Sequence, residues 1–275
     1  MVPNLYPAFG PAHGEVQVEP DGPYLKMDGV GIHEVLITSP AHATDISGLS
    51  NHEAELVVQA WIDRMRVHQD NPTLRYLLLI NNHGKEAGAS PEHPHSQLFG
   101  IPVLPPVYEE EAAGVRRYRD ERRRCVYCDI VAEETSARAR VIFENERFLA
   151  FAPYASRTPF EAQILPKWHS SRFESLTSAE RGAFAEALQA LTGRLETGLN
   201  DPPYNFFIHT SPPHLSGDVD YHWHLELLPK LAIAAGFELG SGVMINVTTP
   251  ESAAEFLRGI EPRSVNRSEL APAIH

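Results

Sequence analysis

The sequence is poor in cysteine, in positive charge and in long apolar runs. Its 275 residues include 2 cysteines, too few for a disulfide framework, so a reducing cytoplasm fits it best. No apolar run approaches the roughly 20 residues of a membrane span, and no basic segment followed by an apolar one opens the chain, so we expect neither membrane insertion nor secretion. A formal net charge of −13 argues against nucleic-acid partners, which require a basic face.

Two histidines separated by a single residue occur twice in the chain. His93 and His95 follow an apolar run and a turn of small residues, and His222 and His224 follow a second apolar run. Side chains at positions i and i+2 of an extended chain point to one face. Each pair therefore suits a site in which one histidine is held in place and the other reacts.

The similarity between the two copies extends upstream of the histidine pairs. A lone histidine, His42 or His169, precedes each pair by nearly the same interval. Between the lone histidine and the pair, each copy has a Ser or Thr followed three residues later by Glu, a capping box that opens an amphipathic helix. This ordered series predicts an internal duplication. We expect an α+β protein of two repeats, with either two sheets or one continuous sheet across a pseudo-twofold axis.

These patterns divide the chain into four parts. We assign residues 1–106 to the first repeat, 107–124 to a charged connector helix, and 125–260 to a second repeat that contains a Cys-x-x-Cys motif. Residues 261–275 have no periodicity and are expected to be mobile. The acidic and basic runs of the connector are interpreted as a solvated helix with ion pairs rather than as a binding patch.

The Cys-x-x-Cys motif predicts a metal site in the second repeat. Cys125 and Cys128 have the spacing at which two thiolates chelate one ion, and a tetrahedral zinc needs two further ligands. His169 and His222 are the candidates, because histidines recur at matched positions of both repeats. A redox-active dithiol is the alternative.

The first repeat offers half of an equivalent site. His42 and His93 match the two histidines, but positions matching the cysteines would fall at or before the first residue. We therefore expect that the first repeat is truncated and that its metal site lacks the cysteine ligands.

Several motifs together resemble the galactose-1-phosphate uridylyltransferase family of the HIT-like superfamily. The resemblance implies a HIT-like fold with two tandem pseudo-symmetric repeats of mostly antiparallel sheet and packed helices. ADP-glucose phosphorylases are near relatives, so the base of the nucleotide stays open between uracil and adenine. The motifs are Pro3–Ala8, Asn82-His-Gly84, Gly88-Ala-Ser90, His93-Pro-His95-Ser-Gln97, Asn200–Asn205 and Gly236-Phe-Glu238.

The resemblance also implies a mechanism. UMP would pass from UDP-glucose to galactose 1-phosphate by double displacement through a covalent uridylyl group on His95. Neutral imidazole can attack phosphorus near pH 7 because its ordinary pKa lies close to that pH, and the covalent intermediate gives ping-pong kinetics. Gln97 lies on the same strand face as His95 and would donate to a phosphate oxygen.

The remaining substrate contacts also follow from the resemblance. Gly88 and Ser90 would approach the phosphates, Asn82 would hydrogen-bond a phosphate, Asn4 would contact the nucleoside, and Glu238 would accept from hexose hydroxyls. Zinc is the implied cofactor and a homodimer the implied assembly. Two other hypotheses stay open: a related phosphorylase or adenylyltransferase of adenine nucleotide sugars, and a truncated protein that binds nucleotide without turnover.

Overall fold

The computed structural model describes residues 2–3, 7–11, 16–40, 45–89, 93–215 and 220–262. Three candidate site residues, Asn4, His42 and Ser90, lie outside these ranges. The tail from residue 263 onward, for which mobility was expected, lies outside them as well.

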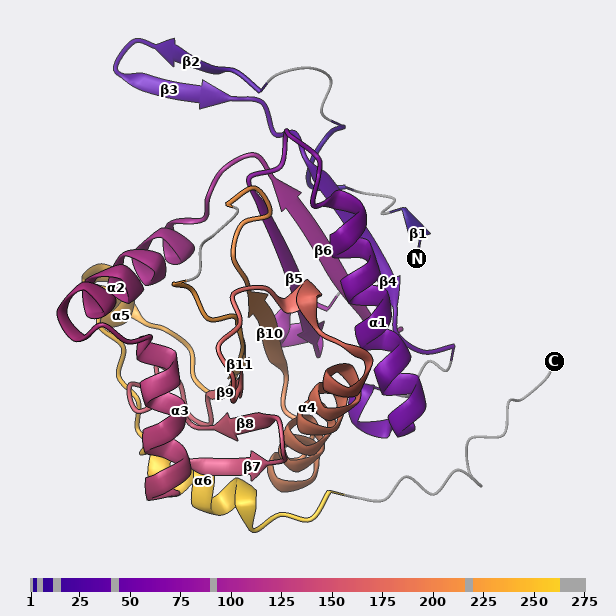
Figure 1. Ribbon diagram of the computed structural model, residues 1–275, viewed down its shortest axis with the longest axis vertical. Helices are drawn as coiled ribbons and strands as arrows, with labels where there is room; N and C mark the ends of the chain where they lie inside the picture. The colour runs from indigo at the N-terminus through magenta and orange to yellow at the C-terminus, as the bar shows by residue number, and fades with distance from the viewer. Residues whose placement is uncertain are drawn as a thin grey trace.

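A nine-stranded antiparallel sheet runs through the molecule in the order β1-β4-β6-β5-β10-β11-β9-β8-β7 (Figure 1). A separate hairpin of β2 and β3 projects from one end of the molecule (Figure 1). The strands are β1 (Val2–Pro3), β2 (Val18–Asp21), β3 (Tyr24–Met27), β4 (Ile32–Ile37), β5 (Tyr76–His83), β6 (His95–Ile101), β7 (Val141–Glu144), β8 (Phe148–Phe151), β9 (Ala162–Pro166), β10 (Tyr204–His209) and β11 (His224–Pro229).

Six α-helices accompany the sheet within the described ranges. Helix α2 spans most of residues 107–124, and it ends where Arg123 adopts a left-handed conformation with φ 60°. No helix in the described part of the chain is long and apolar enough to cross a membrane. The helices are α1 (Asn51–His68), α2 (Pro106–Arg122), α3 (Val126–Ala137), α4 (Ser178–Leu199), α5 (Gly236–Ser241) and α6 (Pro250–Arg258), with 3-10 turns η1 (Ile46–Gly48), η2 (Lys85–Ala87) and η3 (Phe173–Ser175).

The centre of the sheet confirms the duplication. Strands β4, β6 and β5 of the first copy are followed across the sheet by β10, β11 and β9, so the same three-strand unit appears in reverse order. β5 and β10 pair antiparallel where the copies meet, which makes the sheet continuous. Both capping boxes form: the glutamate carboxylates accept from the backbone N–H of Ser50 at 2.8 Å and of Thr177 at 2.7 Å.

One face of the sheet is apolar and the other also carries polar side chains, because side chains alternate along each strand. Leu79, Leu98, Phe206 and Leu225 belong to a single buried core with α1 and α4, two helices that pack against each other. The register pairs Gln97 with Ile80 on one side and Val35 on the other, so these three side chains point to the opposite face. The polar residues of that face include His33, Asn82, His95, Gln97, Asn205, His224 and Glu226.

Candidate active site

His95 is the first residue of β6 and points to the polar face of the sheet. Its Nδ1 lies 3.0 Å from the carbonyl oxygen of His93. A carbonyl can only accept, so in the neutral ring Nδ1 carries the proton and Nε2 carries the lone pair. The residue is 6% exposed, and Nε2 is the ring nitrogen that the carbonyl of His93 does not hold.

Gln97 lies two residues further along β6, on the same face as His95. Its Oε1 accepts a hydrogen bond of 2.7 Å from Nε2 of His33, which lies on the neighbouring strand β4. The amide group of Gln97 therefore keeps its two N–H donors for another partner.

Asn82 and Gly88 meet where β5 ends beside β10. Asn205 donates from Nδ2 to Oδ1 of Asn82 at 2.8 Å and to the carbonyl oxygen of Ala87 at 2.8 Å. Gly88 has φ +89°, and a Cβ on it would stand 3.8 Å from Nδ2 of Asn82. The amide donor of Asn82 thus faces the turn at Gly88, which has no side chain of its own. Asn205 was visible in the sequence as part of a motif, but its link to Asn82 was not.

The structure brings all four predicted zinc ligands of the second repeat together. Sγ of Cys128 lies 3.5 Å from Nδ1 of His169 and 3.6 Å from Nδ1 of His222, and Sγ of Cys125 lies 3.8 Å from the latter atom. In a tetrahedral zinc site, bonds of about 2.3 Å to sulfur and about 2.0–2.1 Å to nitrogen separate neighbouring S and N ligands by about 3.6 Å. The group can therefore hold a metal ion of this size.

Hydrogen bonding and charge prepare the same group for a cation. Nε2 of His222 lies 3.1 Å from the carbonyl oxygen of Pro166, which turns Nδ1 toward the sulfurs. Burial raises the pKa of Cys125, but hydrogen bonds with His169 and His222 outweigh it and lower the pKa to about 5. Burial and the charge of Cys125 raise the pKa of Cys128 to about 12. A bound dication would favour the thiolate form of both.

His93 repeats the outer contact of His222. Its Nε2 lies 2.5 Å from the carbonyl oxygen of Ser39, as Nε2 of His222 faces the carbonyl oxygen of Pro166. The other predicted ligand of this half-site, His42, lies outside the described residues. Among the residues that are described, no group of three or more candidate metal ligands includes His93.

A second group of potential ligand atoms, within 4.8 Å of one another, escaped the sequence reasoning. His209 Nδ1 is 3.0 Å from Oε1 of Glu111, and the hydroxyl of Tyr221 donates to Oε2 of the same carboxylate at 2.6 Å. The sequence carried no signal for it, because Glu111 is one of three consecutive glutamates and His209 ends an apolar strand. The group consists of Glu111, His209, His224 and Glu226.

His224 matches His95 by repeat position but is sealed from solvent. Its ring is 0% exposed, and Nε2 lies 3.8 Å from Oε1 of Glu226. Burial raises the pKa of Glu226, but the nearby ring of His224 and the charge of Arg157 hold it far below its usual range. Of the two matched histidines, His95 is the less buried, at 6% exposure against 0% for His224.

Glu238 is not brought to His95 within this chain. It lies on the short helix α5, at the left edge of Figure 1 and away from β6. Its carboxylate accepts from the backbone N–H of Ala235 at 2.9 Å and so caps its own helix.

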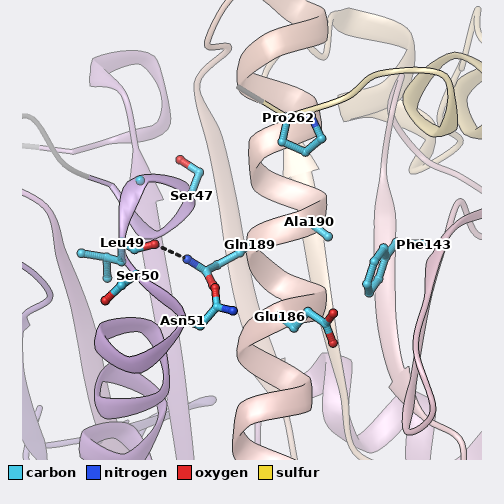
Figure 2. A pocket seen from close by; sticks show the side chains of 10 residues that line it. Ser47, Leu49, Ser50, Asn51, Phe143, Glu186, Gln189, Ala190 and Pro262 are labelled. Atoms are coloured by element: carbon cyan, nitrogen blue, oxygen red, sulfur yellow. Dashed lines mark hydrogen bonds between the residues drawn. The ribbon is translucent and has the colours of Figure 1, made fainter. Parts of the chain in front are cut away.

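A cavity of about 650 Å³ lies on the helical side of the sheet, between η1 and α4 (Figure 2). Gln189 crosses it and donates to the carbonyl oxygen of Leu49 at 2.7 Å. None of the predicted site residues lines this cavity.

Known proteins resemble this chain over most of its length. The ADP-glucose phosphorylase of Arabidopsis thaliana is 33% identical over 263 residues, 94% of this chain and 74% of that protein. The galactose-1-phosphate uridylyltransferase of Thermotoga maritima is 32% identical over 267 residues, 94% of this chain and 83% of that protein.

Solved structures of both kinds have the same fold. A crystal structure of ADP-glucose phosphorylase from Arabidopsis thaliana with bound ADP-glucose superposes with a TM-score of 0.81 at 33% identity, covering 86% of this chain and 76% of that one. A solved uridylyltransferase superposes with a TM-score of 0.86 at 30% identity, covering 94% and 82%.

Family models cover both halves of the chain. Residues 2–105 match the N-terminal domain of galactose-1-phosphate uridyl transferase, and residues 111–271 match its C-terminal domain. Fold and matches together define an enzyme of the transferase class. The chain belongs to the galactose-1-phosphate uridylyltransferase family.

Proposed function

We propose that this protein transfers UMP from UDP-glucose to galactose 1-phosphate through a covalent uridylyl group on His95. The observation that carries the proposal is the bond from Nδ1 of His95 to the carbonyl oxygen of His93, which leaves Nε2 as the nucleophilic nitrogen. Membership of the family supports the reaction class.

The reaction has two balanced steps. Nε2 of His95 attacks the α-phosphorus of UDP-glucose, a P–N bond forms, and the P–O bond to glucose 1-phosphate breaks. A phosphate oxygen of galactose 1-phosphate then attacks the same phosphorus, and the P–N bond breaks to release UDP-galactose. The carbonyl of His93 stabilises the positive charge on the ring of the intermediate, because it accepts from Nδ1–H throughout.

Neutral and backbone donors hold the phosphates in this proposal. Gln97 and Asn82 present amide N–H groups on the polar face, and the turn at Gly88 leaves the backbone open to close approach. Both the leaving and the attacking groups are already ionised phosphates, so positioning and charge stabilisation are sufficient.

We infer that the Cys125, Cys128, His169 and His222 group holds zinc. The separations of its ligand atoms match a tetrahedral site, and both thiols are free of disulfide bonds. The ion would supply structural cross-linking, since it would join the start of α3 to the chain segments beside β9 and β11. Reduced thiols also support the inference of a cytoplasmic protein.

We infer a homodimer as the assembly. Ile233, Leu239 and Val247 are 94%, 77% and 85% exposed, an unusual display of large apolar side chains for a monomer. Glu238 lies on the same stretch of chain, so its expected contact with the hexose would require a second copy. Light scattering on the purified protein tests this. A monomer mass would contradict both the homodimer and the contact of Glu238 with the hexose of a second copy.

The second candidate substrate is an adenine nucleotide sugar. It is supported by the 33% identity to the Arabidopsis thaliana ADP-glucose phosphorylase. Isotope exchange separates the candidates: labelled glucose 1-phosphate should enter UDP-glucose without any acceptor sugar, and His95→Asn should abolish the exchange. Exchange into ADP-glucose alone would favour the adenine nucleotide. Absence of exchange into either would favour binding without turnover.

A further inference from the structure

His33 connects the N-terminal segment to the side chain of Gln97. It lies on β4, opposite Phe99, and its Nε2 is 2.7 Å from Oε1 of Gln97. Its other ring nitrogen, Nδ1, accepts a hydrogen bond of 3.1 Å from the backbone N–H of Ala8. Both ring nitrogens of His33 are therefore engaged by defined groups.

These two contacts fix the tautomer of the neutral ring. A backbone N–H can only donate, so Nδ1 of His33 must carry the lone pair and Nε2 must carry the proton. Nε2–H then requires an acceptor, and only the oxygen of the Gln97 amide can accept. A flipped amide would set the N–H of Gln97 against the N–H of His33, which is unfavourable. The orientation of the Gln97 amide thus follows from a backbone group on another segment.

The ring of His33 is also held in place by packing. It stacks on Phe99 with ring centroids 4.1 Å apart and planes inclined by 24°. Phe99 in turn makes an edge-to-face contact with Phe9, with ring centroids 6.2 Å apart. A stacked, hydrogen-bonded ring is a rigid support for the group that it orients.

The matched position of the second repeat has the opposite character. Glu226 stands where Gln97 stands in the first copy, and its oxygens accept from Gln163 at 3.0 Å and from Arg157 at 2.5 Å. A carboxylate held in this way has no N–H to offer. In the first copy, His33 engages the oxygen of the Gln97 amide, and the N–H donors of that amide stay available.

We propose that His33 is a positioning residue: it fixes the Gln97 amide so that its N–H group faces the phosphate on His95. The inference rests on the proposed function, because it assigns His33 a role in that transfer. It predicts that loss of the His33 donor weakens the transfer step more than substrate binding.

The test compares two substitutions of His33 in the full-length protein. His33→Phe keeps an aromatic ring on Phe99 but removes the donor, whereas His33→Gln places an amide N–H near the position of Nε2. The rate of nucleotidyl-enzyme formation is measured in single turnovers with UDP-glucose and with ADP-glucose, beside the dissociation constant of each. We expect His33→Phe to lower the rate by about tenfold, the effect of one neutral hydrogen bond, with little change in binding, and His33→Gln to restore most of it.

Gln97→Ala supplies the decisive background. If His33 acts through Gln97, adding His33→Phe to Gln97→Ala lowers the rate no further. Equal losses in both backgrounds would overturn the inference. So would nitrogen NMR of the wild-type ring showing the proton of neutral His33 on Nδ1, a result independent of activity and of variant folding. A wild-type chain that forms no nucleotidyl adduct refutes the proposed function, and the role of His33 with it. A wild type that forms the adduct while His33→Phe forms it at the same rate refutes the inference alone.

Discussion

Where the two repeats meet, His83 forms a charged contact that depends on pH. It ends β5, with Nδ1 3.0 Å from Oδ2 of Asp45 and Nε2 2.7 Å from Oδ1 of Asp201, and its ring stacks on Tyr204. Burial lowers the pKa of His83, but the hydrogen bond and charge of Asp45, and then Asp201, outweigh burial and raise the pKa to about 9. We predict that this contact stabilises the folded protein at neutral pH, and that the stabilisation is lost at alkaline pH, where His83 loses its charge.

The size of the effect follows from the two pKa values of His83. The contribution is fully present below the unfolded value of 6.5 and is lost as the pH rises through the folded value of about 9. This difference corresponds to at most about 3 kcal/mol of unfolding free energy. We expect about 1–2 kcal/mol, because Asp201 is 61% exposed and solvent screens its attraction.

The other groups around His83 do not reverse the direction. The pKa of Asp45 is lowered, since hydrogen bonding and the charge of His83 outweigh burial, so Asp45 loses its charge only in acid. Tyr204 donates to Asp45 at 2.8 Å, and burial, together with the charges of Asp45, Asp201 and Glu196, raises its pKa well above 10. The phenol therefore stays neutral over the pH range in question.

Urea unfolding at pH 7 and pH 9.5 measures the prediction. Between these two values the wild type should lose about 1–2 kcal/mol more stability than His83→Gln, which keeps a polar side chain but cannot be charged. Asp201→Asn is the matched control and should remove only part of the difference. Equal losses in wild type and His83→Gln would refute the reasoning.

Three further predictions concern the metal group, the core and the buried charges. Cys128→Ser should lower the zinc content found by elemental analysis and the melting temperature together, because it removes one of four ligands; a wild-type protein without zinc after growth in zinc-containing medium would contradict the assignment. Trp223→Ala should cost about 3–5 kcal/mol in denaturant unfolding, since its 0% exposed ring packs among Phe148, Phe173 and Phe184, and a cost below about 1 kcal/mol would contradict this packing. Arg157→Met should cost about 2–3 kcal/mol, because it removes the cation that the buried carboxylates of Glu161 and Glu226 share. Arg138→Met, which removes a pair between the exposed Arg138 and Glu144, should cost less than about 1 kcal/mol, and equal costs would be inconsistent with the burial.

Local patterns in the sequence predicted much of this molecule. The capping boxes at Ser50 and Thr177 depend on residues three apart, and both form. The Cys-x-x-Cys motif and the two recurring histidines depend on the duplication, and the structure brings Cys125, Cys128, His169 and His222 together. Capping boxes and an internal repeat can be recognised from the sequence alone, because each is defined by residue types at fixed spacings along the chain.

Contacts that depend on strand order could not be predicted in the same way. His33 meets Gln97 only because β4 and β6 are neighbours in a particular register, although the chain between them includes a helix and another strand. Glu111 joins His209 because α2 packs beside the end of β10, and nothing in a run of three glutamates distinguishes the one that faces His209. The choice between two sheets and one was likewise decided by the pairing of β5 with β10, a tertiary event.

The central claim is the covalent intermediate on His95. The most direct measurement is the intact mass of the protein after incubation with UDP-glucose, and separately with ADP-glucose, at alkaline pH, where a phosphorus–nitrogen bond to histidine survives. We predict a single UMP adduct that maps to His95 and is missing from His95→Asn. No adduct with either nucleotide sugar, or an adduct that persists in His95→Asn, would contradict the account.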